Sequence, residues 1–316
     1  MSRFGTLPRR LGHLVLIAFG ITLVTFFLLR LIPGDPALAI LGTSYTHQRA
    51  VAIDLALGLN KPIWTQYILF MGRLFRGNLG YSFFYSEPAT TVIGQHLAPT
   101  IFLVIYAAVL AATISLPLGF LSGLRRGGVV DQSTRVFFTV SFAMPAFWLG
   151  IILLIVFSVH LHVFPISGFG SGFAGHLYYL FLPALTIAVG FSTVLIRSLR
   201  AATIATLQAE FVDTARMKGI SRAKVLRRHV FRNAVLAVIA VFGVNLAYLI
   251  SGTVLVENVF SLPGLGSLLV NSVSNRDYPV VQGVTLLFAL LIVAINLLTD
   301  VTQSALDPRV GQEIGE

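Results

Sequence analysis

The side chains that could carry out nucleophilic chemistry are few and wrongly spaced for it. The chain has no cysteine, which excludes disulfides, zinc–thiolate sites, iron–sulfur clusters and cysteine nucleophiles. Ser171 stands in a glycine-rich stretch, residues 168–172. A Gly-x-Ser-x-Gly nucleophile elbow would need glycine two residues to either side of this serine, where the chain has Phe169 and Phe173. The sequence therefore predicts no catalytic residue.

Nucleotide hydrolysis is excluded on similar grounds. A P-loop places a lysine directly after a glycine, so that the lysine reaches the β- and γ-phosphates of the nucleotide. None of the lysines follows a glycine: Lys61, Lys218 and Lys224. We expect no nucleotide cofactor in this chain.

Three histidines, His160, His162 and His176, surround the same glycine-rich stretch. Imidazoles can hold a metal ion, but the spacing is irregular and no carboxylate lies among them. Ordinary histidines at a membrane interface are the favoured interpretation, a metal site is the weaker alternative, and we predict no metal.

One basic segment has a residue pattern typical of a helix that binds a lipid or protein surface. Residues 197–233 hold nine Lys and Arg against two acids, with helix-compatible composition on both sides of Gly219. Gly219 can end the first helix and Ser221 can cap the second. Spacings of three and four place four side chains on one face: Phe211, Thr214, Ala215 and Lys218. The pattern predicts a short amphipathic helix bent at glycine, which either lies on anionic lipid or docks on a protein.

The amino-acid composition indicates which class of protein contains these residues. The chain has 316 residues, 56% hydrophobic and 11% charged, with a mean hydropathy of +0.87. Soluble domains carry roughly 25% charged residues, so the sequence predicts an all-α integral membrane protein.

Six uncharged stretches are long enough to cross a bilayer, since a span needs about 20 apolar residues. They lie within residues 10–30, 93–124, 135–160, 176–197, 234–256 and 278–299. Pro117, Pro145 and Pro183 interrupt three of them, each as a fixed kink or as a hinge. The expected organisation is a tail and first helix (1–32), an extracytoplasmic segment (33–96), a five-helix core (97–309) with the loop 197–233, and a tail (310–316).

The distribution of positive charge orients the chain. With both termini in the cytoplasm, sixteen of the 22 Lys and Arg lie inside. The net charge of +10 is therefore a topology signal and does not imply nucleic acid. A cleaved signal peptide ending near Ala37-Leu38-Ala39 is the competing interpretation, but the apolar stretch is too long and Arg30 follows it.

The first outer segment should be folded. It opens with a turn at residues 33–36 and continues with helix-like stretches at 47–57 and from Pro62 to Leu74, separated by a break at residues 58–62. A cap on the outer face and part of a docking surface are both open interpretations.

The predicted spans hold almost no ionisable groups in their centres, which argues against an ion-coupled secondary carrier. That carrier stays the alternative function, and a membrane scaffold is a third. Candidate residues for a translocation path are Asn245, Ser251 and Glu257, although most polar residues in spans serve helix packing.

Here the sequence resembles a known family. Asp213-Thr214-Ala215, with Gly219 four residues after Ala215, resembles the cytoplasmic "EAA" loop of binding-protein-dependent ABC importers. Further stretches resemble the dipeptide/oligopeptide/nickel permease family, first-permease type: residues 31–36, 57–62, 77–82, 182–186, 232–234, 256–260, 263–266, 276–280 and 306–309. Asp213 replaces glutamate, Thr214 the first alanine, and Arg232 a proline of the broader pattern.

The resemblance implies the type I ABC importer permease fold and a multi-pass protein of the bacterial inner membrane. It implies a second permease, two ATPase subunits that hold ATP and Mg²⁺, and an external substrate-binding protein. Cargo stays open among dipeptides, longer peptides, glutathione, nickel chelates and haem-like ligands. The implied ATPase-coupling residues are Glu210, Phe211, Asp213, Thr214, Ala215, Lys218, Gly219, Arg222, Lys224, Arg227 and Arg228.

Overall fold

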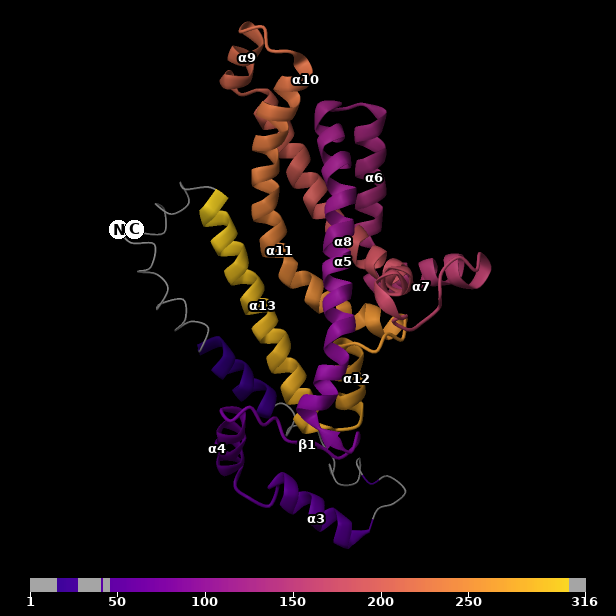
Figure 1. Cartoon of the computed structure of the whole chain (residues 1–316), viewed down its shortest axis with the longest axis vertical. Helices are drawn as coiled ribbons and strands as arrows, with labels where there is room; N and C mark the ends of the chain where they lie inside the picture. Colours follow the sequence, from indigo (N-terminus) through magenta and orange to yellow (C-terminus); the bar gives the residue numbers. More distant parts are fainter. Residues whose placement is uncertain (1–15, 28–40, 42–45, 307–316) are drawn as a thin grey trace, which may run out of the picture. The chain divides into compact units, whose positions relative to one another are not determined.

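The computed structural model describes residues 16–27, 41 and 46–306 and divides into two compact units. Unit 1 takes the chain up to Thr100 together with Pro263–Val293. Unit 2 takes Ile101–Leu262 and the chain from Ala294 onward. Figure 1 labels the helices and strands in chain order.

Unit 1 begins with the helix Leu16–Phe27. It is followed by α3 (His47–Leu57) and α4 (Ile63–Leu74), which confirms the two helices expected in the first outer segment. Gly58 ends α3 in the left-handed region at φ 70°, as the sequence of the break predicts. Phe26 packs against Tyr67 and Phe70 of α4, and this aromatic cluster fixes the first helix on α4.

A short hairpin joins β1 (Tyr81–Ser82) to β2 (Glu87–Pro88), antiparallel, with Tyr81 opposite Pro88. α5 (Ala89–Leu124) follows directly, and α12 (Leu265–Ser274) precedes α13 (Tyr278–Leu306). The Ser82 hydroxyl donates to the carboxylate of Asp277, which is 2% exposed. Burial raises the pKa of Asp277 above its ordinary value, while hydrogen bonds from Ser82 and the Val280 amide act in the opposite direction.

Unit 2 is built around α8 (Gly172–Leu207). In the apolar stretch of α8, 67% of the residues are buried, whereas 28% are buried in the apolar stretch of α5. The helices α6 (Val129–Ala143), α7 (Ala146–Leu153) and α11 (Arg232–Val259) pack on α8. α5 crosses α8 closely: a Cβ on Gly119 would lie 2.9 Å from the Cβ of Leu199, and one on Gly123 2.6 Å from that of Thr203. This is the small-xxx-small contact by which membrane helices approach one another.

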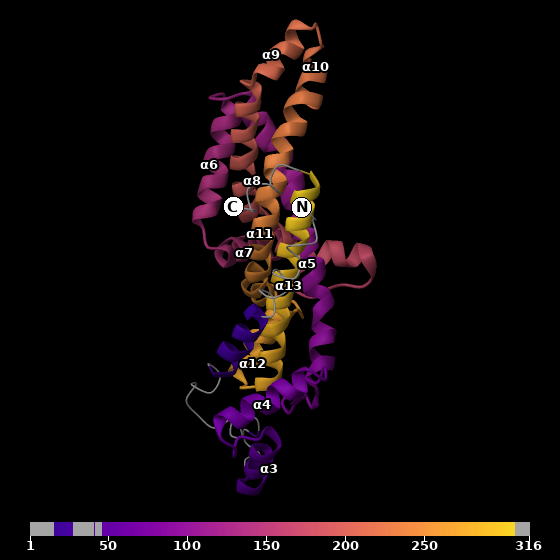
Figure 2. The ribbon, with the colours of Figure 1, turned by 90° about the vertical axis from the view of Figure 1, so that its left-hand side faces the viewer.

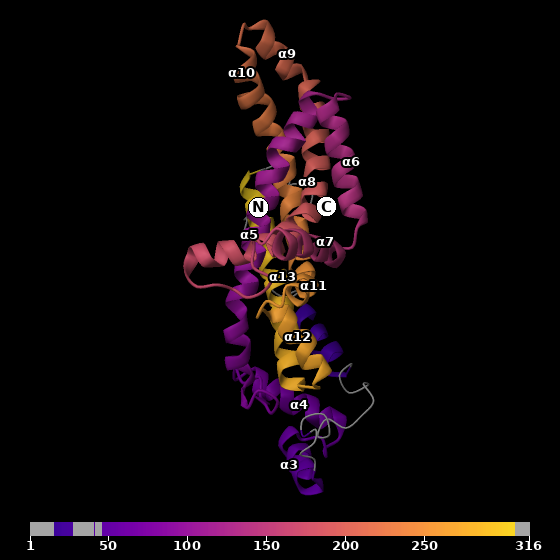
Figure 3. The ribbon, with the colours of Figure 1, turned by 90° about the vertical axis from the view of Figure 1, so that its right-hand side faces the viewer.

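Beyond α8 the chain forms α9 (Glu210–Met217), α10 (Arg222–Lys224) and a π-helical turn, Val225–Phe231, that runs into α11. All three ribbon views show α9 and α10 together at the same end of α8 and α11 (Figures 1, 2 and 3).

The structure agrees with some of the predicted spans and not with others. Four described helices are long and apolar enough to cross a membrane: Ala89–Leu124, Gly172–Leu207, Arg222–Val259 and Tyr278–Thr299. The predicted span at 135–160 is not one straight helix, because α6 and the following helix, Ala146–His160, meet at 106°. Pro145 accordingly interrupts this stretch, while α5 and α8 continue past Pro117 and Pro183. A kink or hinge at these two prolines stays a prediction. Of the first predicted span, only Leu16–Phe27 lies within the described residues.

Candidate functional site

The basic segment folds as two short limbs at the end of α8. The first limb is α9, which carries Glu210 and Asp213 in its first turn, where carboxylates favour the positive end of the helix dipole. The second limb is the helical stretch Arg222–Phe231, α10 and its π-helical continuation. The amphipathic helix followed by a basic helix, expected from the sequence, is present.

Gly219 makes the turn between the limbs. Its φ is +75°, and a Cβ there would meet nothing within 4 Å. Glycine is therefore required by backbone conformation and not by space, because other residues rarely adopt this region. Ser221 stands at the N-cap of the second limb, but its side chain makes no capping hydrogen bond, so the predicted cap is wrong.

One side of α9 packs onto the second limb. Val212 is 0% and Ala215 5% exposed, and both form a cluster with Val225 and Val230. Ala215 therefore does not share an exposed face with Phe211 and its neighbours, as the residue spacing suggested. It holds the two limbs together instead.

The opposite side of α9 is free to bind another surface. Phe211, Thr214 and Lys218 are all exposed. Met217, which the sequence analysis overlooked, is 81% exposed. Asp213 accepts a hydrogen bond from the Arg216 guanidinium at 3.1 Å in an exposed pair, an interaction that contributes little to stability. An exposed aromatic and an exposed methionine beside charges are typical of a contact surface.

The second limb is strongly basic. Arg222, Lys224, Arg227 and Arg228 are exposed. Lys224, Arg227 and Arg228 line one open hollow of about 590 Å³ together with Arg232. The positive charge expected beside the bend is therefore concentrated on one side of the second limb.

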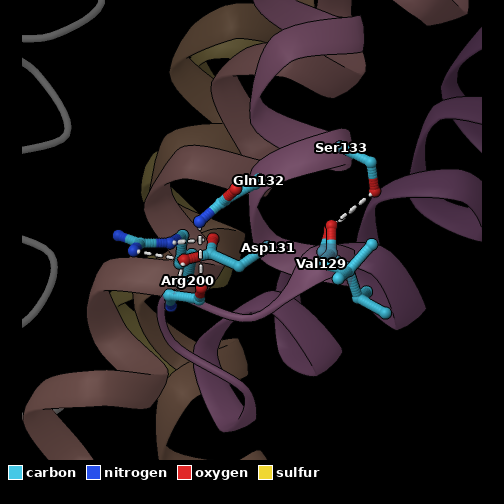
Figure 4. Close-up of polar contacts among 7 residues, drawn as sticks. Val129, Asp131, Gln132, Ser133 and Arg200 are labelled. Atoms are coloured by element: carbon cyan, nitrogen blue, oxygen red, sulfur yellow. Dashed lines mark hydrogen bonds and ion pairs between the residues drawn. The ribbon is translucent and has the colours of Figure 1, made fainter.

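A buried ion pair anchors the base of this segment (Figure 4). The Arg200 guanidinium donates two hydrogen bonds to Asp131, Nε to Oδ1 at 2.6 Å and an Nη to Oδ2 at 2.8 Å. The Gly127 amide donates a third at 2.9 Å, and the Asp131 side chain is 0% exposed. This clamp ties the end of α8 to the turn between α5 and α6. No local pattern in the sequence indicates this pair, because the two residues are 69 positions apart.

The candidate path residues on α11 differ in exposure. Ser251 is exposed and Asn245 is partly buried, its amide donating to the Val241 carbonyl at 2.8 Å. Glu257 is 0% exposed. It is therefore part of the packing of unit 2 and does not line an open path in this structure, contrary to the expectation.

The outer histidines bond to the backbone. The Nδ1 atoms of His160, His162 and His176 each form a hydrogen bond with a main-chain carbonyl oxygen. The His176 ring also stacks on the Phe169 ring, with centroids 3.9 Å apart. Within the described ranges, no group of three potential metal-ligating side chains is found.

Comparison with known proteins decides the family. The model described as "Binding-protein-dependent transport system inner membrane component" matches residues 115–312. The corresponding N-terminal membrane-component model matches residues 1–104. This chain belongs to that permease family. It is a transport component of the inner membrane and not an enzyme, and a carrier working alone finds no support.

Individual relatives cover nearly the whole permease. A probable peptide ABC transporter permease, y4tP of Sinorhizobium fredii, is 36% identical over 96% of this chain and 97% of its own. The di/tripeptide permease DppB of Pseudomonas aeruginosa is 35% identical over 96% and 98%, and the dipeptide permease DppB of Escherichia coli 32% over 96% and 97%.

Solved structures extend the likeness to the fold. A chain of the MetNI methionine ABC transporter, in an inward-facing conformation, has a TM-score of 0.57 at 16% identity. The match covers 70% of this chain and 99% of that one. The expected ABC importer permease fold is therefore confirmed.

Proposed function

We propose that this chain is one of two permease subunits of an ATP-driven importer of peptides. The names of its relatives suggest the cargo. In this proposal a second permease completes the path and an external binding protein delivers the peptide. Two ATPase subunits bind ATP and Mg²⁺ on the cytoplasmic side, and the chain crosses the membrane six times with both termini inside.

The observation that carries the proposal is the two-limbed segment at the end of α8. The exposed face of α9, with Phe211, Thr214, Met217 and Lys218, contacts an ATPase subunit. Glu210 and Asp213 flank that contact, while Ala215 and Gly219 maintain its shape. Arg222, Lys224, Arg227 and Arg228 supply electrostatic support. Closure of the ATPases moves α9 and, through it, α8. Along α11, Asn245 and Ser251 line the path.

The test uses two glycines with equal backbone requirements. Gly219 and Gly172 have φ of +75° and +68°, and a Cβ on either meets nothing within 4 Å. Gly219→Val and Gly172→Val therefore carry the same conformational strain. We expect Gly219→Val to assemble with its partners but to hydrolyse ATP without peptide uptake into proteoliposomes. Gly172→Val should retain uptake. Unimpaired uptake by Gly219→Val would refute the coupling role.

Two further measurements test the partners and the topology. The tagged chain, extracted in mild detergent, should co-purify with a second permease and P-loop ATPases. A chain that purifies alone would contradict the proposal. Because the chain has no cysteine, Met217→Cys and Ser167→Cys each introduce one labelling site. An impermeant maleimide should label position 167 from outside and position 217 only after the membrane is opened.

A further inference from the structure

A cationic hollow lies on the second limb where it runs into α11, and an apolar groove lies further along α11. Both belong to unit 2. The hollow, about 590 Å³, is lined by Lys224, Arg227, Arg228 and Arg232 with Ser221 and Ala223. The groove, about 240 Å³, is lined by Ile239, Phe242, Gly243 and Leu246 of α11 and by Ile295, Leu298, Thr299 and Thr302 of α13.

The four cations have no protein counter-charge in the described part of the chain. None of them takes part in an ion pair there, and no carboxylate lines the hollow. Four like charges around one open space repel one another, which an anion would relieve. Three of them are arginines, whose planar guanidinium binds phosphate with two parallel hydrogen bonds.

The groove presents an apolar surface, although two threonines line it. Thr299 and Thr302 direct their hydroxyls to the carbonyls of their own helix, at 2.8 and 2.7 Å. Gly243 permits the close approach of the helices beside it, since a Cβ there would clash with the Thr299 methyl group. The groove therefore suits hydrocarbon and offers no free hydrogen-bonding group.

The two features lie in register along the helix. Arg232 and Ile239 are seven residues apart, two turns, and so point to the same side of α11. The apolar stretch of α11 begins at Ala234. At about 1.5 Å per residue of α-helix, Arg232 lies about 3 Å outside that point, and Ile239 and Leu246 lie about 8 and 18 Å inside it. Arg228 lies further out, in the π-helical turn.

One leaflet of a bilayer has a headgroup layer of about 5–8 Å and a hydrocarbon half-thickness of about 15 Å. Arg232 therefore lies in the headgroup layer and Arg228 towards its outer edge, and the groove runs from Ile239 in the hydrocarbon to Leu246 near the midplane. From the charge, the groove and their register, we infer that this side of α11 binds an anionic phospholipid. The arginines hold the headgroup phosphate, and an acyl chain lies in the groove between α11 and α13. The inference rests on the proposed topology, in which this end of α11 faces the cytoplasm.

The lipid site bears on the proposed coupling role. The cations are exposed on the second limb, whereas Val225 and Val230 of that limb are buried against α9. A lipid held by Arg228 and Arg232 therefore fixes the height of the second limb at the membrane surface and leaves the contact face of α9 free.

The experiment measures lipid occupancy directly and does not depend on transport. A Leu246→Cys variant of the full chain carries a fluorophore in the groove and is placed in phosphatidylcholine nanodiscs. A small fraction of either phosphatidylglycerol or phosphatidylcholine, spin-labelled on the acyl chain, is then added. We expect phosphatidylglycerol to quench the fluorophore in preference, by about fivefold for each arginine that contacts the anionic headgroup.

Matched variants separate the headgroup from the acyl chain. In the labelled background, Arg228→Gln with Arg232→Gln should abolish the preference, while Arg222→Gln, an exposed cation outside the hollow, should keep it. Thr302→Phe should reduce quenching by both lipids. Val244→Phe, at a 65% exposed position outside the groove, should not. Circular dichroism confirms that each variant is folded.

Four results would overturn the inference. Equal quenching by the two lipids would show that the site has no anion selectivity. A preference that survives loss of both arginines would show that they do not hold the headgroup. Loss of the preference in inorganic phosphate at constant ionic strength would assign the hollow to a free anion. Loss of quenching when the second permease is added would assign the groove to that subunit. Failure of uptake or co-purification with the lipid preference intact would refute the proposed function alone.

Discussion

The clamp between Asp131 and Arg200 leads to the most demanding prediction. Asp131→Asn removes one charge while nearly preserving the shape of the side chain. In the parent protein this fully buried carboxylate accepts two hydrogen bonds from Arg200 and one from the Gly127 amide. The substitution leaves the guanidinium of Arg200 without its counter-charge.

The expected cost follows from the exposure of the group left behind. Removing one partner of a buried ion pair costs about 3–5 kcal/mol. The Arg200 side chain is 24% exposed, so water solvates part of its charge and Asp131→Asn should cost about 3 kcal/mol, the lower end of that range. Arg200→Gln leaves the fully buried carboxylate instead and should cost about 4–5 kcal/mol.

The measurement is the free energy of unfolding in mixed detergent micelles, for the two single variants and for one double variant. Asp131→Leu combined with Arg200→Met replaces both charges by apolar groups and should restore the stability to within about 2 kcal/mol of the parent. The control is Asp213→Asn, which breaks the exposed pair with Arg216 and should cost less than about 1 kcal/mol. If Asp131→Asn costs no more than this control, the clamp does not hold α8 in place and the reasoning fails.

Two further predictions concern packing and pH. Gly123→Ala should destabilise the protein by about 1–3 kcal/mol, because its Cβ would lie 2.6 Å from that of Thr203. Gly190→Ala should be neutral or stabilising by up to about 1 kcal/mol, because a Cβ at this position meets nothing within 4 Å. Equal unfolding free energies of the Gly123→Ala and Gly190→Ala variants would contradict this prediction. Burial raises the native pKa of Asp277 above 3.8, so the native state holds that proton more tightly than the unfolded chain. Its contribution to stability is complete below pH 3.8 and is lost as pH rises through the native pKa; a pH titration of unfolding should show this decline, and Asp277→Asn should remove it.

Local features of the candidate site could be read from the sequence because their causes are local. The break at Gly219 follows from the conformational freedom of glycine, which requires no knowledge of distant contacts. The helix of the first limb follows from spacing within a few residues. The same holds for α3 and α4, whose limits the glycine and proline between them set.

Long-range features were missed because no local pattern encodes them. Spacing shows which side chains share a face of α9, but not which face meets another helix. Spacing alone therefore places Ala215 on the contact surface, although it packs with Val225. Asp131 and Arg200 lie in different helices, and either could have been solvated. Gly119 and Gly123, four residues apart, are the one signal that could have predicted the close approach of α5.

The restraints in unit 2 limit how a movement of α9 can be transmitted. Val212 and Ala215 tie α9 to the second limb, which continues without a break into α11. At its other end α9 follows α8, which the Asp131 clamp and the crossing at Gly123 tie to α5 and α6. Interfaces packed this closely shift as units and do not deform gradually. A force applied to the exposed face of α9 must therefore displace α8 and α11 together. Weakening the Asp131 clamp would release the α6 side of that unit and leave the exposed face of α9 unchanged. Under the proposed function, such a variant separates coupling to ATP hydrolysis from docking of the ATPase.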